Sequence, residues 1–257
     1  APMILNAIQS GEGPPVVLLH GLFGQARNFG TIQRALAPRF RVTALDMRNH
    51  GASPHGADMA YPTQAADVLE TLAHLGIGRA AVIGHSMGGK AAMAAALAQP
   101  ATIGRLLVSD IAPVPYQHGN ADIAAALTSV PLTPGLTRAQ AEAALAPLIP
   151  DPTLRPFLLQ NLSFGPTPAW RIGLDEIAAS VRDLEGWRPI EGRYEGPALF
   201  VAGERSDYIP ADARPIIRGL FPAARFVTVK NAGHWVHADN PAGFLSVLEA
   251  FLASWEG

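Results

Sequence analysis

The sequence of 257 residues contains no cysteine. This absence excludes a disulfide framework, a zinc site built from thiolates and a cysteine nucleophile. A chain without cysteine fits a reducing compartment, and we predict a cytoplasmic location. Residues 1–5 also lack the charged region and the apolar segment that are typical of a signal peptide.

Charge is scarce as well. Charged residues make up 16% of the chain and the formal net charge is −2. Because lysine and arginine form no cluster, we expect no electrostatic binding to nucleic acid. No uninterrupted apolar stretch reaches roughly 18 residues, so we expect no membrane span. Hydrophobic residues make up 49% of the chain, which is enough for one large core. The sequence holds no signal for the oligomeric state.

One stretch combines a strand, a sharp turn and a helix. The apolar residues 80–83 lead into Gly-His-Ser-Met-Gly at 84–88, and an alanine-rich helical pattern follows through Gln99. This is the G-x-S-x-G pattern of a nucleophile elbow, with the strand before it and the helix after it that the motif requires. Bare matches to the pattern are common, and these flanks distinguish this one. We therefore predict that Ser86 is a nucleophile, displayed at the amino end of a helix whose dipole favours negative charge.

Strands and helices alternate along most of the chain. Apolar runs of strand length occur at 15–20, 41–46, 80–84, 103–109, 197–202 and 225–229, with a weak edge strand at 3–8. Helical patterns occur at 29–37, 61–75, 87–99, 211–220 and 241–254. This alternation predicts an α/β fold with a mostly parallel central sheet and helices on both faces.

The alternation stops between residues 114 and 188. This segment contains nine prolines and short helical patterns, and we find no convincing strand in it. We predict a core formed by residues 1–113 and 189–257, with residues 114–188 inserted as a helical cap over the carboxyl edge of the sheet. Sites of α/β proteins lie at that edge.

Five motifs follow one another along the chain: His-Gly-Leu-Phe-Gly at 20–24, Asp-Met-Arg-Asn-His-Gly at 46–51, Gly-His-Ser-Met-Gly-Gly-Lys at 84–90, Asp-Ile-Ala-Pro at 110–113 and Gly-His-Trp-Val-His at 233–237. With them the chain resembles enzymes of the α/β-hydrolase fold over nearly its whole length, above all a branch of small bacterial esterases and their mitochondrial relatives.

The resemblance implies a cofactor-free serine carboxylesterase without a metal, acting on short to medium acyl esters, with acyl-CoA thioesters as a second substrate class to test. The alternatives are a carbon–carbon bond hydrolase, a lactonase or a perhydrolase with the same three catalytic side chains. A ligand-binding relative that has lost catalysis is a further alternative.

A serine nucleophile needs a base, and the base needs an acid that orients it. In this fold the order along the chain is serine, acid, histidine, and the histidine lies on the loop after the last strand. His234 fits that loop, with His237 as the alternative.

The acid is Asp110 or Asp207. Most family members carry it in a Gly-x-x-Asp turn, but here the turn that begins at Gly203 has Ser206 at the acid position and Asp207 one residue later. Asp110 follows the strand after the elbow helix, where other members carry the acid. We favour Asp110, with Ser206 as a supporting hydrogen-bond donor.

Two backbone N–H groups should meet the negative charge of a tetrahedral intermediate. The resemblance implies Met87, directly after the nucleophile, and Leu22, with Phe23 as the alternative. We expect Phe23, Tyr116 and Trp235 to line the substrate pocket, with a place in the apolar core as the alternative for Tyr116 and Trp235. Lys90 is expected to be a surface cation or to brace a loop.

Overall fold

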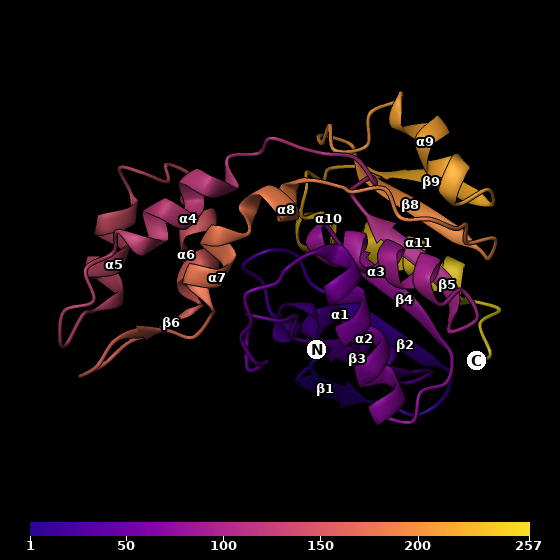
Figure 1. Ribbon diagram of the computed structural model, residues 1–257, viewed down its shortest axis with the longest axis horizontal. Coiled ribbons are helices and arrows are strands. Elements are labelled where there is room, and N and C mark those ends of the chain that lie inside the picture. The colour runs from indigo at the N-terminus through magenta and orange to yellow at the C-terminus, as the bar shows by residue number, and fades with distance from the viewer.

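A computed structural model describes residues 1–257, and its main feature is a seven-stranded sheet with the strand order β1-β3-β2-β4-β5-β8-β9 (Figure 1). The strands are β1 (Ala7–Ser10), β2 (Pro15–Leu19), β3 (Arg41–Leu45), β4 (Ala80–His85), β5 (Ile103–Ser109), β8 (Ala198–Gly203) and β9 (Ala224–Val229). Only the edge strand β1 is antiparallel to its neighbour, and the other pairs are parallel. The predicted mostly parallel sheet is confirmed.

Helices cover both faces of this sheet. They are the 3-10 helix η1 (Ala26–Phe29), α1 (Gly30–Leu36), α2 (Tyr61–His74), α3 (Met87–Ala98), α9 (Ala213–Leu220), α10 (Val236–Asp239) and α11 (Pro241–Leu252). Successive side chains of a strand point to opposite faces, so Val17 and Leu19 of β2 belong to the apolar cluster that includes residues of α2, α3 and α9. Val16 and Leu18 belong to the cluster on the other face, with residues of α1 and α11. Strands that are apolar on both faces are the reason for this double layer.

The strand β4 and the helix α3 lie at the centre of the fold. Every residue of β4 is buried, and so is nearly every residue of α3. Six of the twelve residues of α3 are alanines, whose small side chains let the helix pack closely against β4 and α2. The turn between β4 and α3 is therefore fixed from both sides.

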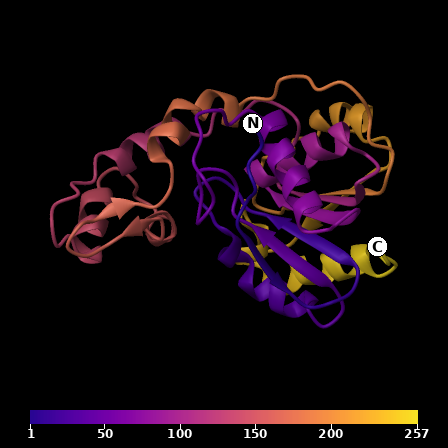
Figure 2. The same ribbon diagram turned by 60° about the horizontal axis from the view of Figure 1, so that its bottom comes forward.

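The segment between β5 and β8 forms a group of its own. In two views its helices stand beside the sheet, joined to it by the chain before α4 and after α8 (Figures 1 and 2). Its elements are α4 (Asn120–Thr128), α5 (Arg138–Leu145), α6 (Leu154–Leu159), β6 (Leu162–Ser163), β7 (Ala169–Trp170), α7 (Leu174–Ala179) and α8 (Val181–Glu185). The division into a core and a cap at residues 113/114 and 188/189 stays a prediction.

The expectation that this segment holds no strand is wrong. The strands β6 and β7 pair antiparallel, and each has two residues. Strands this short show no alternation of polar and apolar residues that a sequence pattern could reveal. None of the helices has the length and apolar character that crossing a membrane requires.

Candidate active site

Ser86 lies in a strained turn between β4 and α3. Its backbone has φ 54° and ψ −117°, in the half of the φ range that residues with a side chain seldom occupy. Two glycines make the turn possible, because a Cβ at Gly84 would lie 2.2 Å from the Gly88 carbonyl oxygen and one at Gly88 would lie 2.3 Å from that of Leu19. The strained turn holds the Ser86 hydroxyl above the sheet edge at the amino end of α3.

A chain of hydrogen bonds connects Ser86, His234 and Asp110. His234 Nε2 lies 3.0 Å from Ser86 Oγ, and His234 Nδ1 lies 2.8 Å from Asp110 Oδ2. An aspartate oxygen accepts, so Nδ1 carries the proton and Nε2 is left to accept from the serine hydroxyl. The loop after β9 places His234, and the end of β5 places Asp110.

The Asp110 side chain is fully buried and well supplied with donors. Besides His234, Ser206 Oγ donates to Asp110 Oδ2 at 2.5 Å, and the Gly203 backbone N–H donates to Oδ1 at 3.1 Å. These hydrogen bonds compensate for the hydration that the carboxylate loses on burial. Asp207, the alternative acid, is exposed and makes no hydrogen bond to His234. The structure brings Asp110, and not Asp207, to the histidine.

His237 does not reach Ser86. Its ring packs against Phe29 and Phe244, with centroid distances of 4.9 and 5.9 Å. Burial lowers its pKa to about 4, so it is neutral at pH 7. His85 has a different place: its Nε2–H donates to the backbone carbonyl of His234 at 2.8 Å and so ties the histidine loop to the elbow.

Two backbone N–H groups at the mouth of the elbow donate no hydrogen bond within the protein. They belong to Leu22 and to Met87, the first residue of α3, whose N–H has no partner in a preceding turn. The Phe23 N–H is not free, because it donates to His50 Nε2 at 3.0 Å. The alternative that placed an oxyanion donor at Phe23 is therefore wrong.

The loop that carries Leu22 is held from the core and from the inserted segment. Phe23 has φ 66°, a value unusual for a residue with a side chain. Its N–H is bound by His50, and its carbonyl accepts from Asn161 Nδ2 at 2.8 Å. Asn161 follows α6, so the segment 114–188 contributes directly to the shape of this loop.

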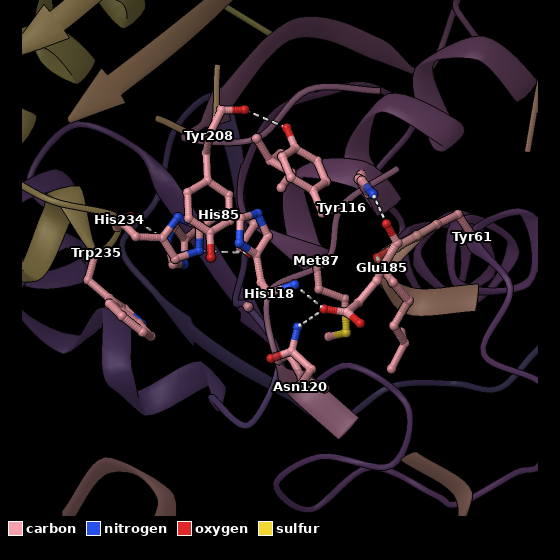
Figure 3. A pocket seen from close by; sticks show the side chains of 16 residues that line it. Tyr61, His85, Met87, Tyr116, His118, Asn120, Glu185, Tyr208, His234 and Trp235 are labelled. Carbon is pink, nitrogen blue, oxygen red and sulfur yellow. Dashed lines mark hydrogen bonds between the residues drawn. The ribbon is translucent and has the colours of Figure 1, made fainter. Parts of the chain in front are cut away.

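A cavity opens over Ser86 and His234 (Figure 3). Core and inserted residues line it together: Gly21, Leu22, Tyr61, His85, Met87, Lys90, Ile111, Tyr116, His118, Asn120, Leu184, Glu185, Tyr208 and Trp235. The expected pocket residues Tyr116 and Trp235 are among them. Phe23 is not, because its side chain is 3% exposed and belongs to the core.

A family model described as alpha/beta hydrolase fold matches residues 14–241. The chain belongs to the alpha/beta hydrolase family. It is similar to the sn-1-specific diacylglycerol lipase ABHD11 of Xenopus laevis, with 41% identity over 251 residues that cover 94% of this chain and 80% of the relative. It is also similar to the esterase YbfF of Escherichia coli strain K12, with 37% identity over 93% of this chain and 92% of the relative.

A solved structure described as a marine microorganism esterase superposes on this hydrolase with a TM-score of 0.94. The sequences are 37% identical, and the match covers 97% of this chain and all of the other. These relatives confirm the predicted fold, the resemblance to small esterases and the carboxylesterase type of the enzyme.

Lys90 of this hydrolase is buried, which corrects the expectation of a surface cation. The side chain is 1% exposed, and its Nζ donates to the carbonyls of Glu185 at 3.3 Å and Gly186 at 2.7 Å. Burial lowers the pKa of Lys90 to about 7. Its contacts agree with the other expectation, a cation that braces a loop, since both carbonyls belong to the end of α8 and the residue after it.

The loop after β3 is built around polar side chains that never reach the cavity. Arg48 donates from Nε and Nη2 to the two carboxylate oxygens of Asp67, at 2.6 and 2.8 Å, and both side chains are buried. His20 Nε2 accepts from the Met47 N–H at 2.9 Å. Burial lowers the pKa of His20 and brings that of His50 to about 3, so both are neutral acceptors at pH 7.

Sequence patterns missed part of the cavity wall. His118, Asn120 and Glu185 come from the inserted segment and carry no motif. Glu185 Oε2 accepts from the His118 N–H and from Asn120 Nδ2, at 2.8 and 3.1 Å, and this links the two ends of the segment. Only the tertiary packing of the segment brings these residues to the site.

Proposed function

We propose that this enzyme hydrolyses carboxylic esters through an acyl-enzyme formed on Ser86. The observation that carries the proposal is the hydrogen-bonded chain from Ser86 Oγ through His234 to Asp110. Ser86 Oγ attacks the ester carbonyl carbon while its proton moves to His234 Nε2. Asp110 accepts from Nδ1–H throughout, which keeps the imidazole in the required tautomer and stabilises its protonated form.

The tetrahedral intermediate carries a negative charge on the former carbonyl oxygen. We assign the two donors that stabilise this charge to the backbone N–H groups of Leu22 and Met87, both without a partner in the protein. The amino end of α3 adds a favourable dipole. In other serine hydrolases the loss of one such donor costs roughly 3–4 kcal/mol of transition-state stabilisation.

The intermediate then collapses. The bond to the leaving alcohol breaks, and His234 gives its proton to that alcohol. Water attacks the Ser86 ester next, with His234 taking a proton from the water and returning it to Ser86 Oγ as the acid leaves. Each turnover consumes one ester and one water and releases one alcohol and one acid.

Apolar side chains near the nucleophile support a hydrocarbon acyl group as substrate. Leu22, Met87 and Ile111 line the cavity beside Ser86. We propose esters of short to medium acyl chains, with acyl-CoA thioesters as a second class open to the same attack. The cytoplasmic location expected from the sequence stays a prediction.

Two measurements test the proposal. A fluorophosphonate probe should add its mass to the peptide that contains Ser86, and a series of p-nitrophenyl esters and acyl-CoA thioesters of increasing chain length should release acid in a pH-stat. Ligand binding without acid release would instead indicate a non-catalytic relative. Turnover of lactones or of carbon–carbon bonds, with all esters left intact, would assign the site to one of those chemistries.

A further inference from the structure

The ring of Tyr208 lies face to face on the ring of His234. The two centroids are 3.7 Å apart and the ring planes differ by 19°. His118 covers the opposite face of Tyr208, with centroids 4.1 Å apart and planes at 20°. Figure 3 shows Tyr208 and His234 side by side at the wall of the cavity, with His118 next to them. The three rings form one stack that ends on the candidate catalytic imidazole.

Hydrogen bonds of its own backbone to two side-chain hydroxyls hold Tyr208 in this position. Its N–H donates to Ser206 Oγ at 3.3 Å, and its carbonyl accepts from the Tyr116 hydroxyl at 2.5 Å. The Tyr208 hydroxyl itself makes no hydrogen bond within the protein, and burial raises the pKa of Tyr208 to about 12. The Tyr208 side chain is therefore uncharged at working pH, and it contacts His234 through the face of its ring.

No other ring lies flat on His234. His85 is 4.8 Å from it and tilted by 46°, while Trp235 is 5.2 Å from it and nearly perpendicular, at 78°. On the far side of Tyr208, burial and the nearby His234 lower the pKa of His118. His118 is thus neutral at pH 7, and no second cation competes for the π electrons of Tyr208.

We propose that Tyr208 is a positioning residue whose ring face stabilises His234 in its protonated form. The proposal rests on the proposed function, in which His234 becomes a cation when Ser86 attacks. The face of an aromatic ring is electron-rich and attracts a cation within about 6 Å of its centroid. The neutral imidazole lacks this attraction, so Tyr208 stabilises the transition state more than the ground state and should act on kcat.

The first test compares three enzymes. Tyr208→Phe keeps the ring face and should retain kcat within about twofold, since the hydroxyl has no partner. Tyr208→Leu should lose about 5- to 30-fold in kcat with KM nearly unchanged, the fold-change that corresponds to a desolvated cation–π contact. An unchanged kcat in the leucine variant would overturn the proposal.

The second test keeps the shape of the ring and changes its electrons. Phenylalanine carrying one, two and three fluorine atoms at position 208 should lower kcat stepwise, because fluorine removes electron density from the ring face. The same fluorination of Phe226, a half-buried residue of β9 outside the cavity, should leave kcat unchanged. A flat series at position 208 would refute the proposal even if the leucine variant fails to fold.

Ser86→Ala, assayed in parallel, separates the two proposals. Residual ester hydrolysis by that variant would refute the proposed function itself. Loss of hydrolysis by Ser86→Ala together with a flat fluorine series would refute only the role of Tyr208.

Discussion

Replacing Asp110 by asparagine tests how the acid acts. Asparagine has the shape of aspartate, and its Oδ1 can still accept from the Gly203 N–H. Its NH2 group, however, replaces the oxygen that accepts from His234 Nδ1. Two donors would then face each other, so His234 is expected to move its proton to Nε2 and accept at Nδ1. The nitrogen that faces Ser86 would be protonated and unable to take the serine proton.

The expected loss in kcat is about 10⁴, which is what the corresponding substitution costs in a serine protease. This factor corresponds to about 5.4 kcal/mol of transition-state stabilisation. The assay is the steady-state hydrolysis of a p-nitrophenyl ester by the purified variant, together with its thermal unfolding curve. A nearly unchanged unfolding temperature would show that the loss arises from the tautomer and not from misfolding.

Asp207→Asn is the matched control, because Asp207 is exposed and makes no hydrogen bond to His234. It should retain the turnover of the wild type. Ser206→Ala removes one hydrogen bond to the Asp110 carboxylate and should lie between the two, with a loss of about 10- to 100-fold. Our reasoning would be refuted by an active Asp110→Asn enzyme combined with an inactive Asp207→Asn enzyme.

Three further predictions concern buried residues that support the loops around the site. Arg48→Ala leaves the buried carboxylate of Asp67 without its partner and should lower the free energy of unfolding by about 3–5 kcal/mol in urea denaturation. His50 has a folded-state pKa of about 3, so between pH 6.5 and 3 the unfolded chain binds a proton that the folded chain does not. Its contribution to stability is complete above pH 6.5 and falls by about 1.4 kcal/mol per pH unit as the pH drops, and unfolding of His50→Gln between pH 4 and 7 should show a shallower slope. Asn161→Leu leaves the buried Phe23 carbonyl without its donor and should lower kcat about tenfold with little change in KM; equal kcat values would show that the inserted segment does not shape this loop.

Much of the fold could be predicted because its signals are local. Parallel strands buried on both faces appear as continuous apolar runs, and glycines mark the turns that require them. The elbow could be predicted for the same reason. At positions 84 and 88 only glycine fits, because a Cβ there would collide with the backbones of α3 and β2.

Contacts between distant segments could not be predicted in this way. Whether the Phe23 N–H is free depends on His50, a residue 27 positions away whose ring nitrogen binds it. A lysine on a helix usually reaches solvent, but the end of α8 and the rings of Tyr61 and Tyr116 cover Lys90. The packing of the proline-rich segment decides both the position of α8 and the wall of the cavity, and a single sequence holds no pattern for it.

The catalytic acid could be predicted only in part from the sequence. Sequence alone could rank Asp110 above Asp207, because Ser206 occupies the position where the acid is usually found. The decisive fact is geometric: β5 and β8 are neighbours in the sheet, so Asp110 and Ser206 meet at its edge, where the Ser206 hydroxyl donates to the carboxylate.

The most direct test of the central claim is the rate of ester hydrolysis by purified Ser86→Ala. The Ser86 hydroxyl forms and breaks the bond to the acyl group in the proposed reaction, so its removal should lower kcat by about 10⁶, the loss seen when a serine hydrolase of the subtilisin type loses its nucleophile. A folded Ser86→Ala enzyme that still turns over p-nitrophenyl esters at a rate near that of the wild type would contradict the account.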